Sequence, residues 1–593
     1  MADNRAGASP ASRPHDLRST GGAADWGAAR AAHRWDLPVR YNIAWDVCEK
    51  WARTDPERLA LIYLRPDGGR RDYTYVQLSR AARRFANALE AHGIARGDRL
   101  GLLLPQMPET IIAHLACYML GVIVVPVFTL FGDDGLAHRL GDAGVRAIVT
   151  DDRNLAKVNR LRDRLPDLAV VFSVDRPGDG AWGFWQELGK AREDLRVVET
   201  GPDDPAFISY TSGTTGPAKG ALHGHRVLLG HMPGIEHTHQ GFPQPGDLAW
   251  TPADWAWIGG LCNMALPALK QGVPLLAHRM EKFDPEYAFD LMARHGVRNA
   301  FIPPTALRMM RGVPDPARFG ARLRSVGSGG ESLGAETLAW GEAVLGVAIH
   351  EFYGQTECNL VIGNDARLAP IVPGAMGRAF PGSDVAVLGA DGEEPLAPGQ
   401  AGEIAVRAGD PAMFLGYWNQ PQKTAAKFRG DWMLTGDEGV AEPGGLFRFA
   451  ARTDDVITSA GYRIGPAEIE NCLTGHPAVA LAAVVGVPDP LRTEAVTAFV
   501  TLKPGARGGA SLAEELTALV RSRVAAHCAP RAVHEIDAMP MTATGKIMRR
   551  ALRERAGDSA PPHAGAQPDA QPEAPAGAKA GAKTGAKAGA RAG

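Results

Sequence analysis

A run of glycine and hydroxyl residues is the first feature of this sequence that could do chemistry. Residues 210–220 read Tyr-Thr-Ser-Gly-Thr-Thr-Gly-Pro-Ala-Lys-Gly and follow an apolar stretch that is typical of a buried strand. Glycines let backbone N–H groups approach phosphate oxygens, the hydroxyls add donors, and Lys219 supplies a positive charge. The run is not a Walker A motif, because Lys219 is followed by Gly220. It predicts a phosphate-binding loop, but the same composition also occurs in plain flexible turns.

Two later segments carry carboxylates beside aromatic or hydroxyl residues. Residues 351–357 read Glu-Phe-Tyr-Gly-Gln-Thr-Glu, in which Tyr353 could cover a purine, Thr356 could bond phosphate and Glu357 could hold Mg²⁺. Residues 433–437 end a strand pattern in Asp437, a carboxylate suited to ribose hydroxyls. Taken alone, the first segment could equally be a core aromatic beside solvated polar residues, and the second an ordinary turn.

A lysine near the end of the chain completes the set. Residues 540–549 read Pro-Met-Thr-Ala-Thr-Gly-Lys-Ile-Met-Arg, which places Lys546 on a short loop beside a glycine. Such a lysine can move into a site and neutralise charge that develops at a phosphate. An exposed surface position is the more common alternative for any single lysine.

Composition limits the kind of protein that carries these segments. The chain has 593 residues and a formal net charge of −2, so it needs at least two domains and has no overall field to attract nucleic acid or an anionic membrane. Six scattered cysteines without a CxxC pair argue against a zinc ribbon or a disulfide framework and favour the cytoplasm. The N-terminus lacks the pattern of a signal peptide. The apolar stretch 111–128 predicts a helix to about Met119 and then a buried strand, not a membrane span.

Alternating strand and helix patterns must position these residues. Strands predicted at 99–104, 147–150 and 169–172 alternate with helices such as 78–92 and 285–295, which indicates doubly wound α/β layers. A break near 452–455 precedes the pattern of a small α+β domain. The predicted organisation is a disordered arm at 1–34, a large domain at 35–451, a hinge at 452–455, a small domain at 456–556 and a disordered Ala/Gly/Lys-rich tail at 557–593.

The motifs, in their order along the chain, resemble those of the acyl-adenylate-forming (AMP-binding) superfamily. The resemblance extends from about residue 41 to residue 553 and rests on five motifs: YTSGTTGPAKG, YGQTE, TGD, RTDDVITSAGYRIGPAEIE and TATGKIMR. The sequences of these motifs are most similar to those of medium-chain acyl-CoA synthetases. The resemblance implies a large N-terminal domain with a β-barrel-like subdomain and a small mobile C-terminal domain. It also implies ATP, Mg²⁺ and CoA as cofactor and co-substrates.

The resemblance assigns a role to each matching residue. Catalysis would involve Lys546, Thr356 and Glu357, with Glu357 also the metal ligand. ATP and AMP would be bound by Thr211, Ser212, Gly213, Thr214, Thr215, Gly216, Lys219, Gly330, Glu331, Ser332, Glu351, Phe352, Tyr353, Gly354, Gln355, Asp437, Arg452 and Arg463. Asp454 would be the hinge, and Ala460 and Gly461 would leave bare backbone for the pantetheine arm of CoA. Ser332 and Ala451 depart from the family pattern, which has Pro and Gly there.

The implied reaction has two halves. A carboxylate attacks the α-phosphorus of ATP to give acyl-AMP and pyrophosphate, and a thiol then displaces AMP. Gly354 stands where acetyl-CoA synthetases have Trp, so we expect room for a medium-chain fatty acid beside Trp255 and Trp257 as walls of the acyl pocket. Short, branched or aromatic acids stay open, as does a stand-alone acyl-AMP ligase that loads a carrier protein. A nucleotide-sensing pseudoenzyme is the alternative from another class, and Lys546 argues against it.

Regulation and assembly are left open by the sequence. Acetylation of Lys546 by a lysine acetyltransferase, and its reversal by a deacetylase, would abolish and restore the charge of that side chain. The expected partners are a small carboxylic acid, ATP and CoA, with no nucleic acid and no membrane span. A homo-oligomer is compatible with the sequence.

Overall fold

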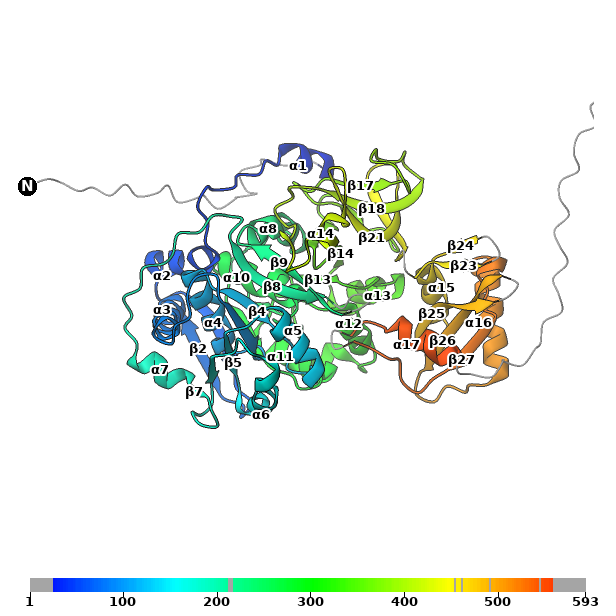
Figure 1. Ribbon diagram of the computed structural model, residues 1–593. Coiled ribbons are helices and arrows are strands. Elements are labelled where there is room, and N and C mark those ends of the chain that lie inside the picture. The colour runs from blue at the N-terminus through cyan, green and yellow to red at the C-terminus, as the bar shows by residue number, and fades with distance from the viewer. Residues whose placement is uncertain are drawn as a thin grey trace, which may run out of the picture.

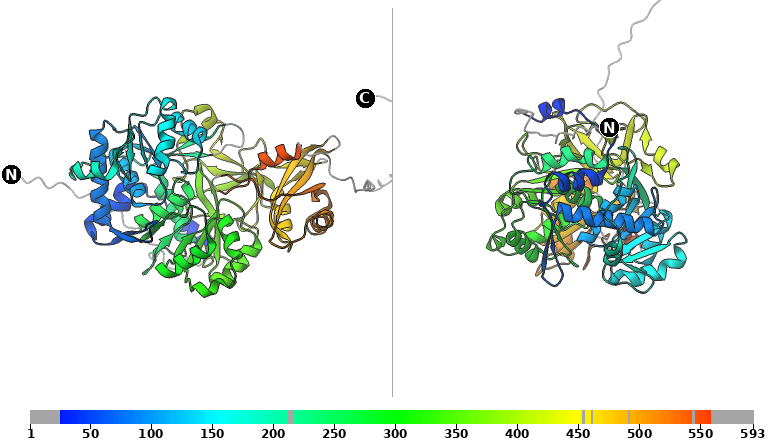
Figure 2. Two further views of the ribbon diagram at one scale, coloured as in Figure 1. Left: turned by 90° about the horizontal axis from the view of Figure 1, so that it is seen from below. Right: turned by 90° about the vertical axis from the view of Figure 1, so that its left-hand side faces the viewer.

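The computed structural model describes residues 25–211, 217–452, 455–459, 462–489, 492–542 and 545–557. The described strands form three sheets. Figure 1 shows two of them in a large body coloured blue to yellow, and the third in a small orange unit to one side. Figure 2 shows the same separation from two other directions.

The first sheet carries the stem of the predicted phosphate loop. Among the described residues it has eight strands in the order β19-β9-β8-β4-β3-β5-β6-β7, with parallel pairing from β8 through β7. Its central strands are buried on both faces, as continuous apolar runs predict. The strands are β3 (Arg99–Leu103), β4 (Ile123–Pro126), β5 (Ala147–Thr150), β6 (Val170–Ser173), β7 (Trp182–Gly183), β8 (Pro205–Thr211), β9 (Lys219–Gly224) and β19 (Gly416–Tyr417).

The second sheet is parallel in one part and antiparallel in the other. Within the described residues it has 14 strands, in the order β17-β18-β21-β22-β16-β15-β14-β13-β12-β10-β11-β1-β2 with β20 beside β21. Pairing is parallel from β14 to β1 and antiparallel from β14 to β17. The parallel strands are β1 (Leu59–Leu64), β10 (Ala249–Trp250), β11 (Leu275–His278), β12 (Asn299–Phe301), β13 (Ser325–Gly329) and β14 (Ile349–Gln355), and the edge strand is β2 (Arg70–Thr74).

The antiparallel half of this sheet forms the β-rich subdomain at the top of Figure 1. Its own apolar cluster includes Ile362, Val387, Ile404 and Met433. The strands are β15 (Cys358–Gly363), β16 (Gly377–Ala379), β17 (Val385–Leu388), β18 (Ala401–Arg407), β20 (Phe428–Arg429), β21 (Trp432–Ala441) and β22 (Leu446–Arg452).

Helices cover the parallel parts of both sheets. Residues near the ends of these helices determine where they begin and end. α11 begins after Asp284, whose carboxylate accepts from Glu286 N and Tyr287 N, and ends at Gly296 with φ +70°. The helices of the large body are α2 (Lys50–Thr54), α3 (Tyr75–Ala91), α4 (Pro108–Leu120), α5 (Asp133–Asp142), α6 (Asp152–Leu161), α7 (Phe184–Lys190), α8 (Val227–Thr238), α9 (Ile258–Gly260), α10 (Leu266–Lys270), α11 (Pro285–His295), α12 (Pro304–Arg311), α13 (Ala335–Trp340) and α14 (Pro421–Ala425). Short turns of other helix types are η1 (Trp45–Glu49), η2 (Arg162–Arg164), η3 (Leu261–Ala265), η4 (Pro316–Phe319) and η5 (Gly341–Leu345).

The apolar stretch 111–128 is a helix followed by a strand, as predicted. All 13 residues of α4 are buried, Gly121 ends the helix with φ +71°, and β4 follows. No helix in the described part of the chain is long and apolar enough to cross a membrane.

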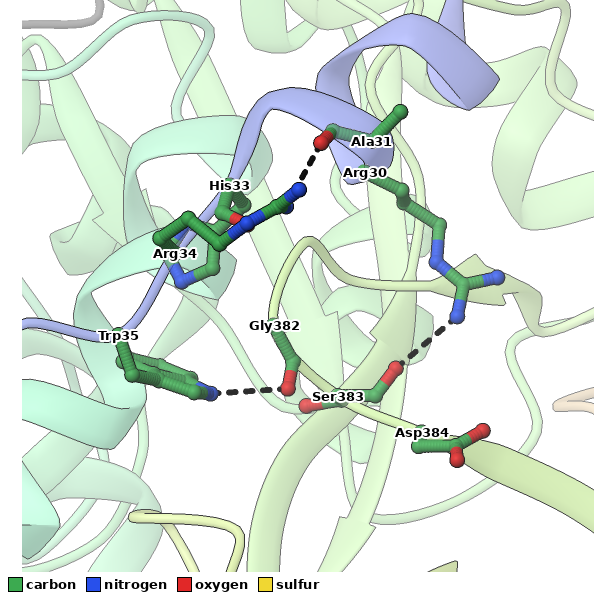
Figure 3. A pocket seen from close by; sticks show the side chains of 8 residues that line it. All are labelled: Arg30, Ala31, His33, Arg34, Trp35, Gly382, Ser383 and Asp384. Carbon is green, nitrogen blue, oxygen red and sulfur yellow. Dashed lines mark hydrogen bonds between the residues drawn. The ribbon is translucent and has the colours of Figure 1, made fainter.

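The end of the predicted N-terminal arm is ordered, which corrects the boundary at residue 34. α1 (Trp26–Ala32) lies on the β-rich subdomain, where Trp26 Nε1 donates to the Ala379 carbonyl at 2.9 Å. Figure 3 shows Arg30 and Trp35 bonded across a shallow surface pocket to the Ser383 and Gly382 carbonyls. Trp26 is 6% exposed, and burial of one indole contributes roughly 1.5–3 kcal/mol. The segment lacks apolar periodicity, so its order depends on this tertiary contact. Residues 1–24 and 558–593, which hold most of the predicted arm and nearly all of the tail, lie outside the described residues.

The third sheet belongs to the small C-terminal unit. Its order is β24-β23-β26-β25, with β27 parallel to β26. Its strands are β23 (Ile457–Ser459), β24 (Tyr462–Ile464), β25 (Val479–Asp489), β26 (Thr493–Leu502) and β27 (Ala532–Glu535), and its helices are α15 (Pro466–Thr474), α16 (Ala510–Arg523), η6 (Ala526–Cys528) and α17 (Arg549–Gly557). The predicted fold class, a large domain of doubly wound α/β layers with a β-barrel-like subdomain and a small α+β domain, is confirmed in its α/β layers and its two domains, and the antiparallel strands of the subdomain continue the second sheet.

Candidate active site

Neighbouring parallel strands bring two of the predicted segments to one edge of the second sheet. Gly329, the last residue of β13, pairs with Phe352 of β14. Residues 330–332 therefore leave the sheet beside residues 353–357, where β14 ends and the chain turns into β15. In open α/β sheets, ligands bind at this carboxyl edge of the strands.

The stem of the phosphate loop is anchored from two sides. Thr211 of β8 pairs with Lys219 of β9. Tyr210 Oη donates to Asp142 Oδ2 of α5 at 2.6 Å, and His138 Nε2 lies 2.8 Å from the Ala218 carbonyl oxygen. The loop residues themselves, Ser212, Gly213, Thr214, Thr215 and Gly216, lie outside the described residues. The structure thus describes a rigid base on which the loop begins and ends.

Glu357 and Lys219 meet at a residue that sequence reasoning missed. Tyr417 Oη donates to Glu357 Oε1 at 2.5 Å, and the Lys219 ammonium lies 4.7 Å from the centre of the Tyr417 ring. β19 holds Tyr417 beside Ala221 of β9, next to the loop stem. The only signal in the sequence was an aromatic pair, Tyr417 and Trp418, more than 50 residues from Glu357. The predicted metal ligand and the loop lysine therefore share one buried tyrosine.

Asp437 is bonded to the segment that carries Glu357. Tyr353 Oη donates to Asp437 Oδ2 at 2.6 Å, and Gln355 Nε2 lies 3.4 Å from the same oxygen. Burial, and then the neighbouring Asp437, raise the pKa of Tyr353 well above its usual value, so the phenol stays protonated and donates. Lys427 Nζ completes the group by donating to Gln355 Oε1 at 3.1 Å. Asp437 also pairs in register with Arg452 at the end of β22.

Glu331 and Ser332 are bonded to the first turns of α12. Arg308 places two guanidinium nitrogens 3.1 Å from Glu331 Oε2, and Arg308 also donates to the Ser332 carbonyl at 3.2 Å. Thr305 Oγ1 is 3.2 Å from Glu331 Oε2. Ser332, which departs from the family pattern, thus contributes its backbone oxygen to this contact.

The loop of Lys546 lies against this same part of α12. Thr305 Oγ1 lies 3.4 Å from the Gly545 carbonyl oxygen, across the two domains. Gly545 has φ +83°, a conformation that favours glycine, and precedes Lys546 directly. Figure 1 shows α17 on the side of the small unit that faces α12. The structure therefore brings the Lys546 loop to the edge where Glu331 lies.

Comparisons with known proteins agree with this geometry. Residues 48–418 match the family AMP-binding enzyme, and residues 468–546 match the AMP-binding enzyme C-terminal domain. The chain belongs to the AMP-binding enzyme family. It is 34% identical over 560 residues, 92% of this chain and 95% of the relative, to human mitochondrial acyl-coenzyme A synthetase ACSM4. It is 31% identical over 538 residues to the acetyl-coenzyme A synthetase of Bacillus subtilis strain 168, with 89% and 93% covered.

A solved structure shares the fold over nearly its whole length. The anthranilate CoA ligase AuaEII, in complex with anthranoyl-AMP, superposes with a TM-score of 0.80 at 26% identity, covering 88% of this chain and 98% of that one. The prediction of an ATP-dependent, AMP-forming acid–thiol ligase is confirmed by these relationships, as are ATP, Mg²⁺ and CoA as the small molecules of such enzymes.

In this AMP-binding enzyme the two predicted pocket tryptophans lie in different surroundings. Trp257 is half-buried, and a Cβ at Gly330 would lie 3.2 Å from its indole, so the ring covers the end of β13. Trp255 is 1% exposed within the main core, and its indole nitrogen has no partner among the described residues. Trp257 therefore lies at the end of β13, whereas Trp255 packs as a core residue, and the part of either in an acyl pocket stays a prediction.

Main chain, not open space, lies where a side chain at Gly354 would begin. A Cβ there would lie 2.3 Å from the Leu360 backbone nitrogen and 2.8 Å from the Cys358 carbonyl oxygen. The main chain of β15 fills this volume, with Leu360 at φ +67°. Glycine permits the close approach of the two strands, and its effect on acyl chain length stays a prediction.

Glu351 and Phe352 form the inner part of the site. Burial raises the pKa of Glu351 to about 7, although the Leu333 backbone N–H, 3.2 Å from Oε1, opposes this shift. The Phe352 ring lies where a Cβ at Gly329 would be within 2.5 Å. These two residues therefore shape the floor beneath the strand ends, with a carboxyl that loses its charge easily.

Some predicted positions cannot be placed. Asp454, Ala460 and Gly461 lie outside the described residues. For Arg452 and Arg463 the structure describes the backbone, which lies in β22 and in β24 respectively. Their roles stay predictions.

The residues present fit a magnesium ion that is brought by ATP. The described chain has no group of three or more His, Cys, Asp or Glu side chains able to hold a metal. Mg²⁺ commonly binds one or two carboxylates and takes its remaining ligands from phosphate and water. Glu357, 7% exposed and oriented by Tyr417, matches that single-carboxylate role.

Proposed function

We propose that this enzyme activates a medium-chain carboxylic acid and transfers the acyl group to CoA. The observation that carries the proposal is the convergence of Lys219, Glu357, Asp437 and the Lys546 loop on the carboxyl edge of β13 and β14. A kinase or a simple ATPase has no need of a second domain that presents a lysine at this edge.

In the first half-reaction an oxygen of the acid attacks the α-phosphorus, and the bond to pyrophosphate breaks. Both reactants are anionic, so cations must offset their repulsion. Lys219 and the loop above it hold the β- and γ-phosphates, Asp437 binds the ribose, and Lys546 neutralises charge at the α-phosphate. A Mg²⁺ ion bound by Glu357 would supply further charge to the phosphates.

In the second half-reaction the thiol of CoA attacks the acyl carbon, and AMP leaves. We propose that Ala460 and Gly461 face the pantetheine arm in this step, after the small domain turns about Asp454. Lys546 has no part in it. The two half-reactions therefore depend on different residues, and each can be measured separately.

The class of acid is supported by similarity to fatty-acyl enzymes and by Trp257. We propose that the half-buried Trp257 ring, which covers the end of β13, limits the depth of the acyl pocket. Because acetate- and anthranilate-activating relatives have the same fold, short and aromatic acids are the alternatives. Carrier loading in place of CoA is the second candidate acceptor.

Acid-dependent AMP release, with and without CoA, tests the proposal across acids of two to twelve carbons, benzoate and anthranilate. We expect a maximum at medium length, a requirement for CoA, and a shift to bulkier acids in Trp257→Ala. Trp182→Ala, an exposed tryptophan on β7, is the matched control. Pyrophosphate release without any effect of CoA would favour the carrier-loading alternative, and a maximum at acetate would exclude the medium-chain class.

Location, regulation and assembly are further proposals. We propose a cytoplasmic enzyme, since all six cysteines are free and five of them are buried. Acetylation of Lys546 would remove the charge used in the first half-reaction. Size-exclusion chromatography with light scattering would test for a homo-oligomer.

A further inference from the structure

Two arginines of α17 contact the carboxylate of Asp455, the last residue of the predicted hinge. Arg553 donates to Asp455 Oδ1 at 2.7 Å, and Arg549 places a second guanidinium nitrogen 3.6 Å from Asp455 Oδ2. The Asp455 side chain is 9% exposed. A carboxylate this buried depends on its charged partners, and removing one of them leaves an uncompensated charge. This contact, which we call the α17 clasp, therefore has a defined geometry.

Arg549 extends the clasp into the body of the small domain. It donates to both carboxylate oxygens of Glu470 in α15, at 2.7 and 2.8 Å. Glu470 in turn accepts from the Val484 backbone N–H of β25 at 2.8 Å. Both contacts come from the single nitrogen Nη2 of Arg549, and hydrogen bonds between charged groups are stronger than those between neutral groups. The first residue of α17 is thus tied to a helix, a strand and Asp455.

The loop that carries Lys546 ends where α17 begins. Its base is closed by a bridge between Met541 and Ile547 and by the Met548 N–H, which donates to the Pro540 carbonyl at 2.9 Å. Within the loop, the Lys546 carbonyl accepts from the Thr542 N–H at 2.7 Å. Lys546 is three residues before Arg549, so the direction of the loop follows the direction of the helix.

We propose that Arg549 and Arg553 are positioning residues, which hold the Lys546 loop at the α-phosphate by fixing the start of α17 to Asp455 and Glu470. The inference rests on the proposed function, because it acts through Lys546. It assigns no contact with substrate to either arginine. Loss of the clasp should slow the step that uses Lys546 and spare the step that does not.

Arg553→Gln and Arg549→Gln test this in the full-length enzyme and leave the predicted hinge residues unchanged. The first assay measures acid-dependent pyrophosphate release, and the second measures acyl transfer to CoA from supplied acyl-adenylate. Because a hydrogen bond between charged groups is lost, we expect the kcat of the first to fall about tenfold, with KM for ATP and the rate of the second within about twofold of wild type. Arg553→Lys, which keeps the charge, should restore part of the loss.

The matched control lies on the other face of the same helix. Arg550 pairs with Glu554 at 2.8 Å, with side chains 77% and 63% exposed, so Arg550→Gln should change neither assay. Thermal unfolding of each variant separates loss of activity from loss of fold. Equal losses in both assays, or no loss in the first, would overturn the proposal.

A coupled variant decides whether the clasp acts through Lys546. In a Lys546→Ala background, Arg553→Gln should lower pyrophosphate release no further, because the side chain that it positions is gone. An independent, additive loss would contradict the proposal. If Lys546→Ala alone left pyrophosphate release unchanged, the proposed function of Lys546 would fail, and the clasp proposal would fall with it.

Discussion

Two lysines are expected to meet the phosphates of ATP, and the chain holds them in different ways. Lys219 is the first residue of β9, inside a hairpin that is bonded to α5 and to β19. Lys546 lies outside regular structure, on a loop whose firm contacts are at its base and at α17. A residue inside a sheet is held in every state of the protein, whereas a loop on a separate domain takes its position from that domain. Lys219 thus suits a ligand bound throughout the reaction, and Lys546 suits a charge that is needed in one step only.

The largest expected effect is that of Lys546→Ala. Pyrophosphate release should fall by about 1000-fold in kcat, comparable to the loss of one preorganised transition-state donor, with little change in KM for ATP. Steady-state assays of the two half-reactions check this, because transfer from supplied acyl-adenylate should persist. If Lys546→Ala raised KM for ATP and left kcat unchanged, the proposed difference between the two lysines would be wrong.

Lys219→Ala should have a smaller effect of a different kind. Since Lys219 contacts phosphates in the ground state as well, we expect KM for ATP to rise about 30-fold with kcat changed far less. Titration of ATP in the pyrophosphate assay measures both constants. If kcat fell as far as in Lys546→Ala, the two lysines would be equivalent and the comparison would be wrong.

Tyr417→Phe tests the contact that joins Lys219 to Glu357. It removes the hydroxyl that donates to Glu357 Oε1 and keeps the ring below Lys219. We expect the Mg²⁺ concentration for half-maximal activity and the Kd of Mg·ATP, measured by calorimetry, to rise about tenfold. Tyr75→Phe is the control, because Tyr75 Oη is equally buried and donates to the Leu269 carbonyl, away from the site. The same shift in both variants would indicate a general loss of packing.

The last expected effect is on stability rather than on activity, and it concerns Glu351 of β14. Burial raises its pKa from 4.5 to about 7, so the folded protein keeps a proton that the unfolded chain has released, and stability falls as pH rises through this interval. Glu351→Gln should remove up to about 3 kcal/mol of that dependence. The Tm of the variant relative to wild type should therefore increase between pH 5 and pH 8, while the exposed Glu342→Gln follows wild type. A constant difference across this range would refute the burial argument.

Several predictions from the sequence were correct because their signals are local. The helix and strand in 111–128 follow from an apolar run interrupted by Gly121, and the large domain follows from alternating strand and helix patterns. The order of the motifs was enough to indicate the family. The helix at Trp26 was missed, because one buried indole leaves no periodic pattern in a sequence.

The sequence by itself determined the phosphate-loop stem, the carboxylates Glu357 and Asp437, the lysine Lys546 and the two-domain plan, because each depends on residue type and short-range spacing. Only the tertiary structure decided that Tyr417 bonds Glu357 and that Arg549 and Arg553 bond Asp455, since these pairs are 60 to 98 residues apart. It also placed the main chain of β15 beside Gly354, where the residue type alone suggested open space. The type of a residue determines which chemical groups are available. The space beside that residue depends on which segment of the folded chain packs against it.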